Sequence, residues 1–459
     1  MEESIRQYIE LYEHHRDALC SHSIPAMNAL REQAAGHLRH ARLPRLGSEN
    51  YEITSLSELL GKDYGVNINR LPMDVNPAES FRCGVPRLST SLFLTINDRF
   101  ALTPISTNGL PAGVTVCSLN SQGAVPSEII GRYYGGLASL DNPIAALNTL
   151  LAQDGILIHV ARGTKVDKTI QLVNILQSAV PLMAVRRVLI VLEENAEVNI
   201  LACDHTQNNT VDMMNLQVVE IYAGAGSRLE YYEMEESSVR SVRLSALYAE
   251  QSADSHVTIN GITLYNGVTR NEYYCRFTGK GAELSLCGMG IEDGERRLDT
   301  YSHVEHTVGY CHTDELFKYV LDDSSRGAFT GLVRVDEGAV KTEAYQSNRN
   351  IVGSGEARMY SKPQLEIYND DVKCSHGTAI GRLDEMQLFY MRSRGLAEEE
   401  AKLLLKQAFL SDVIEKVRLS HLRERLTYLV ERRFAGGEDA CLSCKGQESC
   451  GEVDMNIEY

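Results

Sequence analysis

Two side chains that bind metals, Cys374 and His376, stand two residues apart in a segment that is typical of a β-strand. Successive side chains of a strand point to opposite faces, so both ligands would lie on one face, with Lys373 and Ser375 on the other. A thiolate beside an imidazole suits zinc or iron chemistry, but two ligands do not complete a site. We therefore expect the remaining ligands to come from elsewhere.

Three further cysteines, Cys441, Cys444 and Cys450, lie in a polar and acidic C-terminal segment. The first two have the spacing of metal ligands, but the set holds only three thiols and no nearby histidine. They could bind iron or zinc with a fourth ligand from outside, or they could form an exposed thiol-bearing tail. The sequence leaves both alternatives open.

A third group consists of His303, His306, Cys311 and His312. These side chains could assemble a transition-metal site if a turn brought them together. Their irregular spacing instead favours a structural or interface role.

The composition indicates a soluble globular protein of two or three domains, with 459 residues of which 43% are hydrophobic. The formal net charge of −17 argues against binding to nucleic acid or to an anionic membrane, because both depend on clustered Lys and Arg. Eleven widely spread cysteines fit reduced thiols. The chain shows no signal peptide and no apolar run of about 18 residues, so we expect a cytoplasmic protein.

The middle of the chain is typical of a large β-structure. Between Pro181 and Pro363 there is no proline, which permits uninterrupted hydrogen-bond ladders on both sides of every strand. Short β-rich runs are separated by turn residues at roughly ten-residue spacing, and about 20 strands would fit between residues 100 and 378. We favour a parallel β-helix over a propeller, because no blade-length repeat is visible, while a sandwich stays open.

Helical patterns flank this β-region. Near the N-terminus, Ile5, Tyr8, Ile9 and Tyr12 form an apolar stripe, and a second stripe follows Pro25. From Asp384, a plausible N-cap, the pattern returns to a helical period and predicts three short helices. We expect a mainly helical region at 1–100, a β-helix core at 101–380, a helical module at 381–435 and a flexible tail at 436–459.

Several longer stretches closely resemble the SufB/SufD family of the SUF iron-sulfur cluster assembly system, and its SufD branch in particular. They are residues 365–377, 381–395, 315–322, 327–329, 341–342 and 345–350, with weaker similarity at 154–155 and 110–114. The resemblance covers most residues from about 100 to 433. The N-terminal helices match only loosely, and the tail lies outside the family's common core.

The resemblance implies a mainly β protein, with a right-handed parallel β-helix flanked by N-terminal and C-terminal helical regions. It also implies a non-catalytic scaffold subunit that pairs with SufB through the end of the β-helix and binds the SufC ATPase through its C-terminal helices. His376 matches the family histidine implicated in nascent cluster assembly at the SufB interface, and Cys374 matches its interface neighbour. The iron-sulfur cluster would be transient and shared with SufB, and none is expected in the isolated chain.

The missing ligands of the Cys374 and His376 pair would then belong to SufB. We expect part of the helical module, around Asp412, Val413 and Ile414, to dock SufC, and the isolated chain could form a homodimer.

Other functions remain open from the sequence alone. One alternative is a SufB-like scaffold subunit, although SufB-like chains lack the Cys-Ser-His signature. Another is a β-helix enzyme that acts on polysaccharide, for which Asp322, Asp323 and Asp336 could supply carboxylates. A third is a homodimer that stores or senses metal through the tail cysteines.

Overall fold

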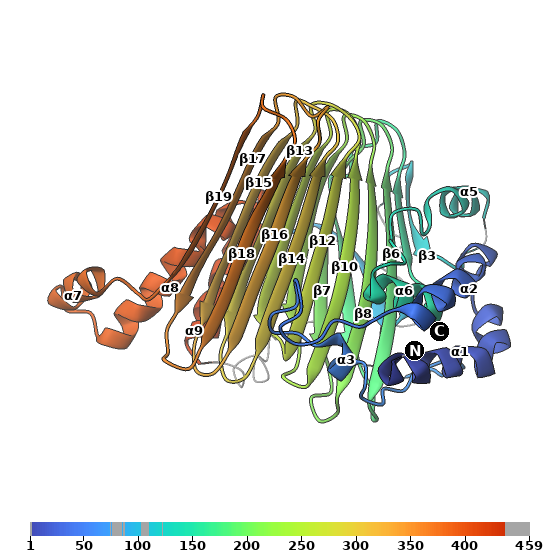
Figure 1. Cartoon of the computed structure of the whole chain (residues 1–459), viewed down its shortest axis with the longest axis horizontal. Helices are drawn as coiled ribbons and strands as arrows, with labels where there is room; N and C mark the ends of the chain where they lie inside the picture. Colours follow the sequence, from blue (N-terminus) through green and yellow to red (C-terminus); the bar gives the residue numbers. More distant parts are fainter. Residues whose placement is uncertain are drawn as a thin grey trace.

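The computed structural model describes residues 2–73, 75, 85, 88–101, 110–121 and 123–436 of the chain. Its centre is a parallel β-solenoid built from two facing sheets (Figure 1). Among the described residues, one sheet has ten strands in the order β19-β17-β15-β13-β11-β9-β7-β5-β1-β2, and the other has nine in the order β18-β16-β14-β12-β10-β8-β6-β4-β3. The parallel β-helix expected from the sequence is therefore confirmed.

From β4 onward, successive strands along the chain alternate between the two sheets. The strands are β1 (Thr90–Ile96), β2 (Arg99–Ala101), β3 (Val114–Ser118), β4 (Ile156–Val160), β5 (Thr169–Leu176), β6 (Leu182–Leu192), β7 (Glu197–Thr206), β8 (Met213–Ala223), β9 (Arg228–Glu236), β10 (Ser241–Gln251), β11 (His256–Tyr265), β12 (Val268–Phe277), β13 (Glu283–Glu292), β14 (Arg297–His306), β15 (His312–Leu321), β16 (Arg326–Val335), β17 (Glu343–Val352), β18 (Arg358–Ile367) and β19 (Lys373–Gly381).

Only the pairs β1 with β2 and β3 with β4, at the N-terminal end of the solenoid, are antiparallel among the described strands. Every other pair is parallel, and apart from a register shift near the end of the β9 and β11 pair, equivalent residues of successive coils stack above one another. One such stack inside the solenoid consists of Ile170, Ile200, Tyr231, Ile259 and Leu286. Stacks of this kind fill the space between the two sheets and form its apolar core.

The N-terminal helices cover the outer face of the nine-stranded sheet. They are α1 (Glu3–Ser21), α2 (Pro25–His40), α3 (Leu56–Leu59), α5 (Ala124–Tyr133) and α6 (Pro143–Leu151). The stripe from Ile5 to Tyr12 is buried, as its spacing predicted. Helices α2 and α6 pack together over β6, β8 and β10. The buried Arg31 donates hydrogen bonds to the carbonyls of Leu150 and Ala152, each at 2.6 Å, which satisfies free acceptors at the end of α6.

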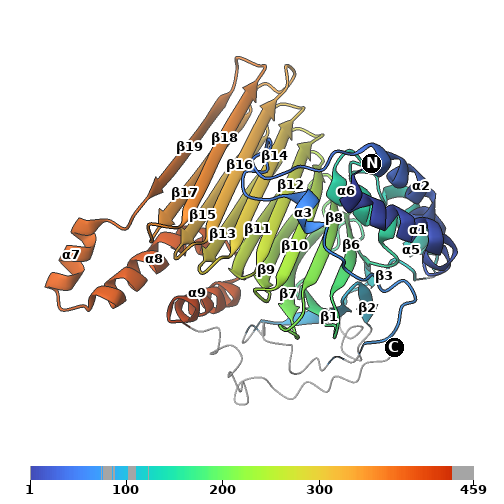
Figure 2. The ribbon, with the colours of Figure 1, turned by 60° about the horizontal axis from the view of Figure 1, so that its bottom comes forward.

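The C-terminal helices are α7 (Glu385–Ser393), α8 (Glu398–Glu415) and α9 (Ser420–Phe434). Figure 2 shows α8 and α9 against the other sheet, where their apolar residues join a separate core cluster. Helix α8 runs along β15 and is held there by three ion pairs. These are Lys406 with Asp322 at 2.6 Å, Lys416 with Asp314 at 2.5 Å, and Lys318 with Asp412.

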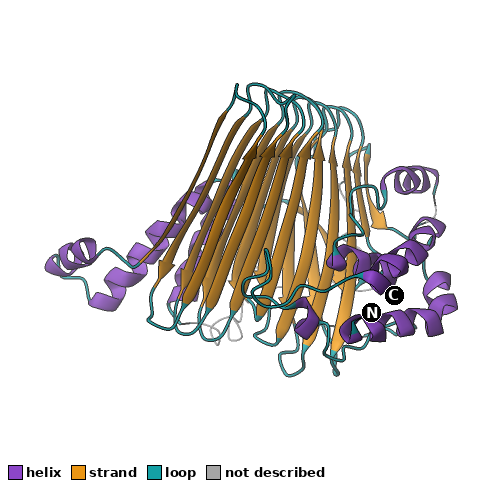
Figure 3. Cartoon of the chain, in the orientation of Figure 1, coloured by secondary structure: helices purple, strands orange, loops and turns teal. Residues whose placement is uncertain are grey.

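Helix α7 differs from the other two because none of its residues is buried. It stands away from the solenoid, beyond β19 and at the opposite end from the N-terminal helices (Figure 3). Asp384 caps it, as the sequence predicted, since its carboxylate accepts hydrogen bonds from the backbone N–H groups of Met386 and Gln387.

Two features lie across the expected boundary at residue 101. Strands β1 and β2 begin before it, and α5 and α6 lie within the range 101–380. The sequence does mark the start of helix α6. Asn142 caps the helix by accepting hydrogen bonds from the N–H groups of Ile144 and Ala145, and Pro143 occupies its first turn. The division into domains stays a prediction. None of the described helices is long and apolar enough to cross a bilayer.

Candidate functional site at the open end of the solenoid

The last coil of the solenoid, formed by β18 and β19, has no covering element in the described part of the chain. Strand β19 ends one sheet and β18 ends the other, and none of their side chains is buried. Four large apolar side chains are exposed here: Tyr360 (41%), Ile367 (42%), Tyr368 (56%) and Ile380 (49%). Long exposed edge strands with apolar side chains readily pair with another chain, so this end has the properties of a docking surface.

Cys374 and His376 both belong to β19, the outermost strand. Cys374 is in register with Ala344 (0% exposed) and His376 with Gln346 (3% exposed), two residues that point into the solenoid. The two ligands therefore share one face, as their spacing predicted, and the register shows that it is the interior face of the open coil. Lys373 takes the outer face, where it pairs with Glu343 at 2.8 Å.

The two ligands differ in their surroundings. Cys374 is half-buried against the interior core, and this burial raises the pKa of its thiol. His376 is exposed. Because metals bind the thiolate, a metal at Cys374 would have to displace this proton.

Cys374 and His376 do not form a complete metal site. Within the described residues, no group of three or more His, Cys, Asp or Glu side chains could hold a metal ion. The open coil offers one thiol and one imidazole on the same face, next to exposed strand edges. Chemically, this arrangement can supply part of a site that a second chain completes.

Behind His376, the interior carries two further polar residues that the sequence alone did not single out. Glu315 is fully buried on β15 and accepts hydrogen bonds from Ser302 at 2.7 Å and Gln346 at 3.3 Å. Burial raises the pKa of Glu315 to about 7, although both hydrogen bonds oppose the rise. Register connects these residues, because Glu315, Gln346 and His376 stack in three successive coils.

The group His303, His306, Cys311 and His312 is not brought together as a metal site. His306 lies inside the solenoid, stacked on Phe277 at 4.4 Å between ring centroids and hydrogen-bonded to Thr313 at 2.9 Å. Burial lowers the pKa of His306 to about 3, so it is neutral. His306 therefore has a structural role inside the solenoid, one of the two roles that the irregular spacing favoured.

The expected docking residues on α8 face the solenoid. Val413 is 0% exposed and Ile414 is 7% exposed, both within the cluster that joins α8 and α9 to the sheet. Asp412 pairs with the buried Lys318. In this conformation Val413 and Ile414 offer little surface to a partner, and a docking role for this region stays a prediction. Cys441, Cys444 and Cys450 lie outside the described residues.

The carboxylates considered for polysaccharide chemistry have structural contacts. Asp322 pairs with Lys406 at 2.6 Å, and Asp336 pairs with Arg334 at 2.9 Å. Asp323 accepts a hydrogen bond from the N–H group of Gly294 at 3.0 Å. Each of the three carboxylates therefore has a partner within the fold.

The chain is similar to known proteins over most of its length. The chain matches a family model described as the SUF system FeS cluster assembly, SufBD core domain, over residues 174–409, and one described as the SufBD protein N-terminal region over residues 2–172. It is 29% identical over 411 residues to an iron-sulfur cluster assembly SufBD family protein of Synechocystis, covering 88% of this chain and 90% of that protein.

Two proteins named SufD are also similar. The iron-sulfur cluster assembly protein SufD of Escherichia coli is 33% identical over 191 residues, which are 42% of this chain and 44% of that protein. SufD of Bacillus subtilis is 25% identical over 311 residues, which are 67% of this chain and 71% of that protein. The core model spans just over half of the chain and includes Cys374 and His376. The chain therefore belongs to the SufB/SufD family of SUF-system iron-sulfur cluster assembly proteins and is a homologue of SufD.

Proposed function

We propose that this protein is a non-catalytic scaffold subunit that assembles iron-sulfur clusters together with SufB and the SufC ATPase. In this proposal the open coil pairs with SufB, and His376 supplies one ligand to the nascent cluster. The cluster is the cargo of the complex, held transiently between the two chains. The isolated subunit would carry none.

One observation supports this proposal most strongly: Cys374 and His376 lie on the interior face of the open end of the solenoid. At this end, β18 and β19 each have an edge with no neighbouring strand in the described part of the chain, and apolar side chains are exposed on the same coil. A partner with a similar open solenoid would cover the edges and bring its own ligands to the same place. Two incomplete sites would then form one complete site.

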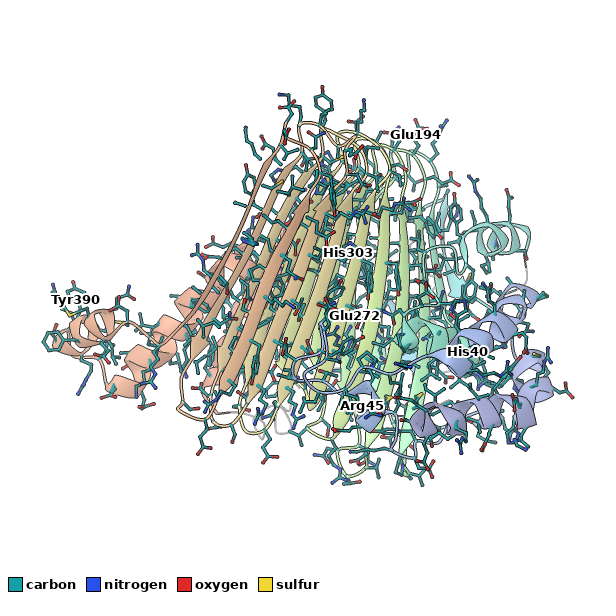
Figure 4. All side chains as sticks on the ribbon, in the orientation of Figure 1. His40, Arg45, Glu194, Glu272, His303 and Tyr390 are labelled. Carbon is teal, nitrogen blue, oxygen red and sulfur yellow. The ribbon has the colours of Figure 1, made fainter. Side chains whose placement is uncertain are left out.

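Helix α7 supports the second contact, with SufC. Met386 (74%), Phe389 (68%) and Tyr390 (57%) are exposed on it, and Figure 4 shows Tyr390 pointing away from the solenoid. A helix of nine residues is not expected to be stable without packing, because most helical stability in proteins comes from tertiary contacts. We infer that the exposed side of the helical module, α7 above all, docks SufC. A cytoplasmic location stays a prediction.

Co-expression with SufB and SufC tests the proposal. Replacement of Ile367 and Ile380 by Asp should prevent co-elution with SufB but leave SufC bound. Replacement of Phe389 by Asp should prevent co-elution with SufC but leave SufB bound. His376→Ala should leave the complex intact and lower its iron and sulfide content. His312→Ala serves as the matched control, since His312 is a partly exposed histidine on the outer face of β15.

The proposal fails if the chain does not co-elute with its cognate SufB and SufC. It also fails in its central part if the His376→Ala complex contains as much cluster as the wild type. Release of reducing sugar from polyuronides by the purified chain would favour the polysaccharide-active alternative instead.

A further inference from the structure

The interior stack that ends at His376 changes character along the solenoid. After Ser91 at its start, its positions are Ile170, Ile200, Tyr231, Ile259 and Leu286, all buried and packed in the interior core. The next three, in register, are Glu315, Gln346 and His376. A buried acid and a buried amide thus lie directly behind the exposed histidine.

Hydrogen bonds fix the direction of the Gln346 amide. Its Nε2 donates to Glu315 Oε1 at 3.3 Å, while Ser302 Oγ donates to Glu315 Oε2 at 2.7 Å. The NH₂ group of Gln346 is therefore turned back toward the preceding coil. Its Oε1 must then point toward the following coil, where His376 is the register neighbour.

Gln346 is only 3% exposed, and its amide oxygen is buried and has no hydrogen-bond partner among the described residues. A buried acceptor left without a partner destabilises the fold, so a donor near this oxygen would be favoured. Register neighbours in adjacent strands lie about 4.8 Å apart, within reach of a side chain. In the described conformation His376 is exposed and does not bond this oxygen, but its imidazole is the candidate donor in the following coil.

The opposite wall of the solenoid provides the space for this amide. A Cβ atom at Gly331 would lie 2.3 Å from Nε2 and 2.9 Å from Oε1 of Gln346. Any other residue at this position would displace the amide. The absence of a side chain at Gly331 and the hydrogen bond from Gln346 to Glu315 therefore both keep the Gln346 amide in place.

We propose that Gln346 is a positioning residue for His376, with its Oε1 accepting the N–H of one imidazole nitrogen so that the other nitrogen is left unprotonated for iron. A neutral imidazole has one donor and one acceptor nitrogen, and its hydrogen bond selects the tautomer. Histidines that bind metals are commonly oriented in this way by a second residue. The role toward iron rests on the proposed function, whereas the hydrogen bond is inferred from the unpartnered Oε1 and from strand register and needs no iron.

The first experiment measures the tautomers of His376 in the full-length chain labelled with ¹⁵N-histidine, with the His376→Ala spectrum used for assignment. We expect the ratio of the two neutral tautomers in the wild type to differ by about fivefold or more from that of free histidine, as a hydrogen bond worth about 1 kcal/mol would produce. Gln346→Leu should bring the ratio close to that of free histidine. Gln217→Leu is the control, because Gln217 is also 3% exposed and also donates to a buried carboxylate, that of Glu233.

An unchanged ratio in Gln346→Leu would overturn the proposal. If that variant does not fold, Gly331→Ala replaces it, since the added methyl group crowds the amide and should shift the ratio in the same direction. This measurement needs neither partner nor cluster. Its outcome is therefore independent of whether the proposed function is correct.

The second experiment measures cluster content in the complex with SufB and SufC. Gln346→Leu should lower it about tenfold, the lower end of the effect expected for residues that orient a metal ligand. In a His376→Ala background the same change should have no further effect. Equal losses in both backgrounds would mean that Gln346 acts on the fold rather than through His376. If His376→Ala itself has no effect, the proposed function fails while the tautomer measurement still decides the role of Gln346.

Discussion

The buried acid Glu292 predicts a specific pH dependence of stability. This residue ends β13 and is 1% exposed. Burial raises its pKa from 4.5 to about 8, although the guanidinium groups of Arg433 and Arg296 oppose the rise. The folded protein therefore keeps a proton on Glu292 over a pH range in which the unfolded chain has released it.

The sign and size follow from linkage. A raised pKa in the folded state stabilises the fold below the unfolded pKa, and this stabilisation is lost as the pH rises toward the folded pKa. At about 1.4 kcal/mol per pH unit, the loss through Glu292 between pH 5 and pH 8 is about 3–4 kcal/mol. Glu292→Gln removes this titration while keeping the shape of the side chain.

The assay is chemical unfolding followed by tyrosine fluorescence at several pH values. The stability of Glu292→Gln relative to the wild type should increase between pH 5 and pH 8 by about 3–4 kcal/mol. Glu295→Gln, at an exposed residue in the turn after β13, should show no such trend. A difference between Glu292→Gln and wild type that is constant with pH, or that decreases as the pH rises, would refute the reasoning.

Three further predictions concern the stability of the fold: a packed aromatic side chain, an ion pair and a helix cap. Phe317→Ala should lower the free energy of unfolding by about 3–5 kcal/mol, because Phe317 is 1% exposed and contacts Tyr273 and Phe329, whereas Phe389→Ala should change it by less than about 0.5 kcal/mol. Equal effects in unfolding experiments would contradict the assigned burial. Asp412→Ala should leave the buried ammonium group of Lys318 without its carboxylate and speed hydrogen exchange in α8, and unchanged exchange there would show that the ion pair does not hold the helix. Asp384→Ala should lower the stability of helix α7 by about 1 kcal/mol, because the helix loses its N-cap, and should increase hydrogen exchange in α7 alone. Loss of the whole fold would disagree with the isolated position of that helix.

The sequence was informative where a local pattern has one physical meaning. The stripe from Ile5 to Tyr12 and the cap at Asp384 predicted helices that are present. The proline-free stretch and the regular turn residues predicted a long array of strands. Asn195 and Gly226, for example, adopt positive φ angles in the turns of successive coils. Cys374 and His376 shared one face because a strand has a period of two.

Other features depend on long-range register, which a single sequence does not reveal. Gln346 stacks on Glu315 only because the intervening residues complete one coil of the solenoid. Strand β6 is buried along its whole length, with helices on one side and the interior on the other, so alternation of polar and apolar residues does not mark its inner face. Val413 and Ile414 were expected to contact a partner, yet they pack on the solenoid, since an apolar stripe does not specify what covers it.

The central claim is that His376 of this chain binds the nascent cluster. Pulsed EPR of the reduced complex with SufB and SufC, in which only this chain carries ¹⁵N-histidine, measures this contact directly. The proposal predicts a ¹⁵N hyperfine coupling to the cluster in the wild type and its loss in His376→Ala. A complex that contains the cluster but shows no ¹⁵N coupling from the wild-type chain would contradict it.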